Sequence, residues 1–133
     1  MRAKEIVLRF IELINAHDVD GLYDLMTEDH KFVDALGETV QGRDLMRGAW
    51  KMYFRMAPDY HISCDEMIGE GNVVAAFSVA GGTYSQDGKK LPVENRWQAP
   101  VALRAEINSD FVAEWRVYVD NEPIRRLMIQ TGQ

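Results

Sequence analysis

The sequence has little of what builds a disulfide framework or a metal site. Its 133 residues include one cysteine, Cys64, so no disulfide can form within the chain. The cysteine and the 3 histidines show none of the spacings typical of a zinc site. We therefore expect no metal and no other cofactor, and the simplest interpretation of Cys64 is a small buried residue in a strand.

Long apolar runs and clusters of positive charge are also missing. Residues 1–10 alternate charged and apolar side chains, unlike a secretion signal or a membrane-spanning helix. The 15 Lys and Arg residues are scattered along a chain whose net charge is -6, so a nucleic-acid partner is not expected. These features indicate a cytoplasmic protein that associates with neither nucleic acid nor a membrane.

Apolar residues, in contrast, are plentiful enough to close one core around a cavity, because they make up 47% of the sequence. A chain of this length is too short for a second domain, so residues 1–133 are expected to form a single domain. No low-complexity or long polar tract interrupts them, which argues against disorder.

The first half of the sequence has the period of helices. Apolar residues recur at three- and four-residue steps over 3–16, which predicts an amphipathic helix. Asp18 can cap a short second helix that follows it. A third apolar stripe over 45–57 predicts another helix, which Pro58 ends because proline cannot continue the hydrogen-bond ladder. Between the second and third helices, residues 30–34 alternate like a short strand.

After Pro58 the period changes to two, as in β-strands. The four predicted strands are Tyr60–Ile68, Val73–Tyr84, Val93–Ala105 and Phe111–Val119. Turn-forming Gly, Asn and Asp residues separate them, which predicts an antiparallel meander. Helices first and strands afterwards is an α+β order, and a long twisted sheet curls so that helices can lie in its concave face. The sequence therefore predicts a cone-shaped curved sheet wrapped by N-terminal helices, with an apolar pocket inside.

Three segments resemble the nuclear-transport-factor-two-like superfamily, in particular its SnoaL-like polyketide cyclase and ketosteroid isomerase branch. They are Asn15–Leu22 (NAHDVDGL), Val33–Gly37 (VDALG) and Glu114–Asp120 (EWRVYVD). The resemblance implies a cystatin-like cone with an antiparallel or mixed sheet, and homodimers that meet through the convex sheet face. It also implies cofactor-free chemistry on hydrophobic ring systems in many members. Because the superfamily includes non-enzymatic binders, a non-catalytic ligand-binding or dimerisation module is the alternative to an enzyme.

Asp34 is the first candidate for a catalytic residue. It lies where ketosteroid isomerases of this superfamily keep a proton-shuttling aspartate, on a strand before a Gly turn, with His30 and Phe32 on the same face. A carboxylate in a dry cavity can remove a carbon-bound proton from an apolar substrate. The alternative is an ordinary Asp that caps the turn.

Other features of these relatives are missing. The isomerases have an oxyanion-binding tyrosine in the first helix, and the matching residue here is Phe10. Their second oxyanion-binding group is a protonated aspartic acid, and the matching segment here, Pro100–Leu103, contains no acid. Steroid isomerisation is therefore disfavoured. The Arg and Asp pair of superfamily epoxide hydrolases is likewise not matched by Asn95 and Trp97.

Asp120 is the second candidate. It resembles a general-base aspartate of the cyclases near the end of the last strand, with Arg116 and Tyr118 as neighbours on one polar face. An Asp34 and Asp120 pair could divide the base and acid roles. The alternative is that Asp120 only terminates the strand. The opposite face, with Trp115, Val117 and Val119, is expected on the convex side, covered by a second copy of the chain.

Aromatic side chains in the third helix and in the long strands suit a flat ligand held by stacking. The expected pocket-lining residues are Phe10, His30, Phe32, Trp50, Tyr53, Phe54, Asn95, Trp97, Arg116 and Tyr118. The same aromatic stripes are compatible with an ordinary core. The sequence thus predicts acid/base chemistry on a small hydrophobic molecule that contains a ring.

Overall fold

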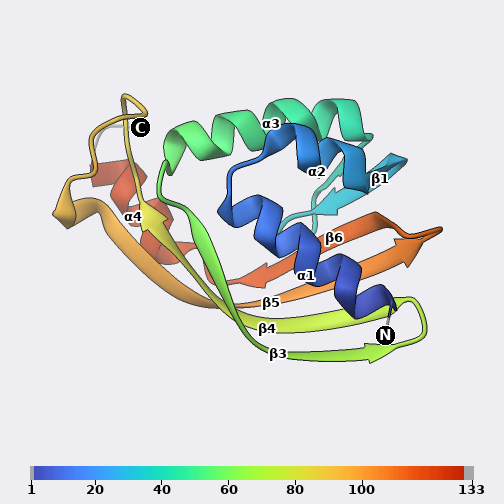
Figure 1. Ribbon diagram of the computed structural model, residues 1–133. Coiled ribbons are helices and arrows are strands. Elements are labelled where there is room, and N and C mark those ends of the chain that lie inside the picture. Colours follow the sequence, from blue (N-terminus) through green and yellow to red (C-terminus); the bar gives the residue numbers. More distant parts are fainter. Residues whose placement is uncertain (1, 131–133) are drawn as a thin grey trace.

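Three helices lie along one face of a single bent sheet in the computed structural model, which describes residues 2–130 (Figure 1). These three helices are α1 (Arg2–Asn15), α2 (Val19–Leu25) and α3 (Arg43–Met56). A short 3-10 turn, η1 (Val93–Asn95), and a fourth helix, α4 (Glu122–Gln130), come later in the chain. The strands are β1 (Met26–Val33), β2 (Thr39–Gln41), β3 (His61–Glu70), β4 (Val73–Thr83), β5 (Arg96–Asn108) and β6 (Phe111–Val119). None of the helices within residues 2–130 is long and apolar enough to cross a bilayer.

The sheet has the strand order β2-β1-β6-β5-β4-β3. Strands β3 to β6 form the predicted antiparallel meander, whereas β1 runs parallel to β6, so the sheet is mixed. The pairing register shifts between Cys64 and Glu66 in β3 and between Glu106 and Ile107 in β5, and such bulges increase bending and twist. The predicted α+β fold with a curved sheet and N-terminal helices is confirmed.

Helix α1 buries the apolar face that its sequence period predicts. Phe10 is fully buried, and its ring lies 4.6 Å from the ring of Trp115 on β6. Helix α2 begins after Asp18, whose Oδ1 accepts a 2.9 Å hydrogen bond from the amide of Gly21. This side-chain cap is the one expected from the sequence.

Strand β6 buries the face that the sequence analysis expected on the convex side of the sheet. Trp115 is 1% exposed, and Val117 and Val119 also point to the interior, whereas Arg116 and Tyr118 lie on the convex side. The reason is the position of β6 between β1 and β5, where its apolar side must be covered by helices. The prediction that Trp115, Val117 and Val119 form an exposed convex row is therefore wrong.

Helix α4 was not predicted, because the residues around its start, 120–123, are also typical of the end of a strand. The Oδ1 atom of Asp120 accepts from the amide of Glu122 at 3.0 Å, and Pro123 is tolerated in the first turn of a helix. Glu122 also pairs with Arg125 and Arg126 one turn later. In Figure 1, α4 lies at the end of the sheet where α3 ends.

His30 predicts a pH dependence of stability. It is fully buried, its Nδ1–H donates to the carbonyl of Val112 at 2.7 Å, and Nε2 has no partner among the described residues. Burial lowers the pKa of His30, and the Val112 carbonyl and the charges of Asp29 and Glu114 oppose this only in part. The unfolded chain therefore binds a proton more readily than the folded one, and stability is lost as the pH falls below about 6.5.

We expect the free energy of unfolding, measured with urea at several pH values, to fall with acidification more steeply in the wild-type protein than in His30→Gln. The variant will be less stable at neutral pH, but the difference between the two proteins should shrink as the pH falls. Parallel pH profiles would contradict this assignment.

Candidate functional site

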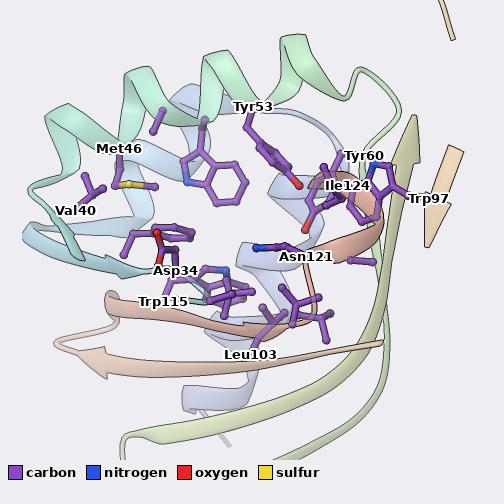
Figure 2. A pocket seen from close by; sticks show the side chains of 18 residues that line it. Asp34, Val40, Met46, Tyr53, Tyr60, Trp97, Leu103, Trp115, Asn121 and Ile124 are labelled. Atoms are coloured by element: carbon purple, nitrogen blue, oxygen red, sulfur yellow. The ribbon is translucent and has the colours of Figure 1, made fainter. Parts of the chain in front are cut away.

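A cavity of about 290 Å³ lies between α3 and the concave face of the sheet (Figure 2). The helix contributes Met46, Ala49, Trp50 and Tyr53, and the sheet contributes Ala80, Trp97, Val101, Leu103, Trp115, Val117 and Val119. The ends are formed by Phe32, Asp34, Ala35, Val40, Tyr60, Asn121 and Ile124. A mostly apolar cavity with few polar groups is typical of a small-molecule site.

Asp34 is the one carboxylate among the lining residues, which include no Lys, Arg or His. It is half-buried and follows β1 directly. Figure 2 shows it at the same end of the cavity as Val40 and Met46. An anionic ligand would therefore meet a like charge in an apolar enclosure and no compensating cation.

The two oxygens of Asp34 have different surroundings. Oδ1 accepts hydrogen bonds from the amides of Leu36 and Glu38, both at 2.9 Å, and so caps the turn between β1 and β2. Oδ2 makes no hydrogen bond or ion pair within the described part of the chain. The turn-capping interpretation of Asp34 is therefore confirmed for Oδ1, and the catalytic interpretation stays a prediction, for which Oδ2 is the candidate atom.

Four aromatic rings follow one another along the cavity. Their centroids are 6.3 Å apart for Trp50 and Tyr53, 4.8 Å for Tyr53 and Tyr60, and 5.9 Å for Tyr60 and Trp97. The indole N–H groups of Trp50 and Trp97 are shielded from water and have no acceptor within residues 2–130. These indoles therefore contribute apolar area, while the phenols contribute hydrogen-bonding groups.

Burial raises the pKa of both phenols. For Tyr53, the neighbouring Tyr60 adds to the effect of burial; for Tyr60, burial raises the pKa to about 12, although hydrogen bonding with Tyr53 acts in the opposite direction. Both hydroxyls consequently stay protonated at physiological pH. The backbone of Tyr60 is fixed by His17, whose Nε2–H donates to the Tyr60 carbonyl at 2.8 Å.

Of the residues expected to line the pocket, Phe32, Trp50, Tyr53 and Trp97 lie in the cavity wall. Three others pack in the core behind it: Phe10 against Trp115, His30 against Phe10, and Phe54 against Trp50 and His17. They are apolar or fully buried, so packing rather than ligand contact explains their positions.

The remaining candidates lie outside the wall. Asn95 donates from Nδ2 to the carbonyl of Tyr84 at 3.1 Å and so holds the loop between β4 and β5. Arg116 and Tyr118 lie on the convex side, because β6 buries its apolar face instead. Asp120 is exposed, and its Oδ1 accepts from the amide of Glu122 at the start of α4. The structure therefore does not bring Asp34 and Asp120 together in the cavity.

Several lining residues were missed from the sequence. Trp115 was assigned to the other face of its strand, Asn121 directly precedes the unpredicted helix α4, and Ile124 lies in its first turn. The spacing of Ile124, Leu127 and Met128, all packed on the core, was the signal that could have found this helix. No group of three or more His, Cys, Asp and Glu side chains suited to a metal ion occurs in the part of the chain that the structure describes.

A curved mixed sheet covered on one face by helices is the architecture of proteins with ketosteroid isomerase-like and cystatin-like folds. The chain belongs to the SnoaL-like domain family, whose family model matches residues 7–121. The resemblance inferred from the sequence is thus confirmed.

Solved structures agree on the fold. A protein classed as a SnoaL-like polyketide cyclase from Shewanella putrefaciens has a TM-score of 0.81 at 12% identity, over 98% of this chain and 87% of that one. A protein of ketosteroid isomerase-like fold from Catenulispora acidiphila, in complex with trimethylamine, has a TM-score of 0.77 at 20% identity, over 90% and 88%. An LEH-like epoxide hydrolase from M. tuberculosis has a TM-score of 0.78 at 13% identity, over 97% and 90%. Among curated proteins, none matches this sequence.

Proposed function

We propose that the protein is a cofactor-free enzyme that moves a proton on an uncharged, hydrophobic substrate containing a ring, with Asp34 as the base. The observation that carries the proposal is a lone carboxylate at the wall of an apolar cavity, with Oδ1 fixed by two amides and Oδ2 free. Fixing one oxygen orients the other without a second side chain. Such positioning is a large part of what general-base catalysis requires.

The reaction that this arrangement supports is a proton shuttle. Oδ2 of Asp34 takes a proton from carbon, and the electron pair left on the substrate is delocalised into an adjacent carbonyl. The same carboxyl group then returns the proton to another atom of the substrate. One acid is sufficient for both steps, which suits a site where Asp120 is exposed and lies outside the cavity wall.

The proposal can be tested without knowing the natural substrate. A panel of ring ketones that includes α-tetralone and β-tetralone is incubated with the protein in heavy water, and exchange of carbon-bound hydrogen for deuterium is followed by NMR. We expect the protein to accelerate exchange next to the carbonyl for at least one member. The absence of acceleration across the panel would count against proton transfer as the function.

A non-catalytic ligand-binding module is the second candidate. One reason is that Oδ1 of Asp34 already accepts a hydrogen bond within a turn. The other is that the cavity wall contains six aromatic residues and one carboxylate, a combination that suits a small alkylammonium ion. The neighbour from Catenulispora acidiphila holds trimethylamine. Saturable binding of trimethylammonium, together with no exchange of any ring ketone, would favour this alternative.

We also propose that the convex face of the sheet pairs with a second copy of the chain. Phe77 is 41% and Tyr118 50% exposed, and both are in register with Ala102 across β4, β5 and β6. Two ion pairs, from Arg104 to Glu106 and to Glu114, lie on the same strands. An apolar row with a charged border is typical of an interface between subunits.

Substituting Phe77→Glu places a charge in this row and is expected to convert a dimer into a monomer. Analytical ultracentrifugation at micromolar concentration measures the change. The matched control is Leu36→Glu, because Leu36 is more exposed than Phe77 and lies in the turn between β1 and β2. A wild-type monomer, or a Phe77→Glu variant that stays dimeric, would contradict the proposal.

A further inference from the structure

We infer that Tyr53, Tyr60 and Asn121 form a hydrogen-bonding subsite that receives an uncharged oxygen atom of the ligand, at the end of the cavity away from Asp34. Tyr53 comes from α3, Tyr60 from the segment before β3, and Asn121 from the segment after β6. All three line the cavity. Figure 2 shows the two phenol oxygens directed toward each other, with the Asn121 amide directed into the cavity beside them.

The hydrogen-bonding capacity of these groups is not used up within the protein. Two phenols carry two O–H groups, and a hydrogen bond between them would use only one. For residues 2–130, no further hydrogen bond of either hydroxyl occurs, and the side chain of Asn121 has none. Polar groups at the wall of an apolar cavity are stabilised by a hydrogen-bonding partner, so this position favours a polar atom of a ligand.

The charge of the site selects the kind of oxygen. The subsite contains only neutral donors and acceptors, and the lining residues within 2–130 include no cation. A carboxylate or phosphate would lose its hydration without gaining a counter-charge, whereas a carbonyl or hydroxyl oxygen needs only one or two donors. The subsite therefore suits a carbonyl or hydroxyl oxygen of the ligand and disfavours a carboxylate or phosphate.

The donors are held in place before the ligand arrives. The carbonyl of Tyr60 accepts from His17, and the ring of Tyr60 packs between those of Tyr53 and Trp97. Fixed donors of this kind stabilise negative charge that develops on a carbonyl oxygen during proton removal. Only this stabilisation of negative charge rests on the proposed function. The oxygen subsite itself would bind a ketone whether or not Asp34 removes a proton.

The test compares α-tetralone with tetralin, which has the same rings and no oxygen. Binding is followed by tryptophan fluorescence and calorimetry, and the carbonyl stretching band of bound α-tetralone by infrared spectroscopy. We expect the wild-type protein to prefer the ketone by about tenfold, the value of one hydrogen bond. We also expect the bound carbonyl band to lie at lower wavenumber than in water-free solvent.

Tyr60→Phe and Tyr53→Phe should each reduce this preference, and the double variant should abolish it and shift the carbonyl band back. Tyr23→Phe is the matched control, because its hydroxyl donates to Asp44 on the surface at 2.7 Å. Thermal unfolding checks that each variant folds, and the single variants remain informative if the double variant does not. Equal binding of ketone and hydrocarbon, binding of neither, or a preference that survives in Tyr60→Phe and Tyr53→Phe would each overturn the inference.

Asp34→Asn separates this inference from the proposed function. The variant should keep the preference for α-tetralone while losing deuterium exchange. If the wild-type protein shows the preference but no exchange, the subsite stands and the proton-transfer proposal falls. If exchange occurs but the preference is absent, the proton-transfer proposal stands and the subsite falls.

Discussion

Replacing Asp34 by asparagine is expected to slow protein-catalysed deuterium exchange of a ring ketone by about 100-fold or more. Asparagine cannot accept a proton at physiological pH, yet its carbonyl oxygen can still accept from the amides of Leu36 and Glu38. The turn that positions the side chain should therefore persist. NMR exchange rates at equal protein concentration measure the loss.

Asp120→Asn is the matched control for this experiment. It makes the same chemical change at an exposed carboxylate that accepts from the amide of Glu122 and lies outside the cavity wall. We expect its exchange rate to equal that of the wild-type protein. A rate that survives in Asp34→Asn, or that falls equally in both variants, would contradict the assignment of the base.

Replacing Trp115 by alanine is expected to lower the free energy of unfolding by about 3–5 kcal/mol. Trp115 is 1% exposed, its ring lies 4.6 Å from that of Phe10, and it also forms part of the cavity wall. Removing it enlarges a cavity that the surrounding sheet cannot close. Urea unfolding monitored by circular dichroism measures the change.

Phe111→Ala on the same strand is the comparison, because Phe111 is 42% exposed. Its loss should cost much less, since part of its surface already contacts water. If the two variants lost similar stability, Trp115 would not be the interior residue that the structure places beneath α1.

The sequence period was sufficient for most of the fold, because most of the long elements bury one face. Helix α1 and strand β5 show this directly, with every third to fourth residue buried in α1 and every second residue buried in much of β5. Asp18 was found from its side-chain chemistry, since an N-cap depends on contacts within one turn.

Features that depend on distant contacts were not predictable in the same way. The parallel pairing of β1 with β6 places β6 in the middle of the sheet, and this position decides which face of β6 is buried. The period of β6 gives two faces but does not say which one the helices cover. Helix α4 was missed because Asp120 and Pro123 are as common at the end of a strand as at the start of a helix.

The candidate site shows the same division. Phe32, Asp34, Trp50, Tyr53 and Trp97 were found because they lie on the predicted inner faces of their elements or match a family position. Tyr60 and Asn121 come from connecting segments, whose side-chain directions follow from tertiary contacts such as that between His17 and the Tyr60 carbonyl.

A crystal structure of the protein with α-tetralone tests the proposed site most directly. We predict that the rings lie between α3 and the sheet, in contact with Trp50 and Leu103, with the ketone oxygen near Tyr60 and a carbon next to the carbonyl facing Oδ2 of Asp34. A cavity filled by its own side chains, with Asp34 directed to solvent and the ketone absent or bound only on the surface, would contradict it.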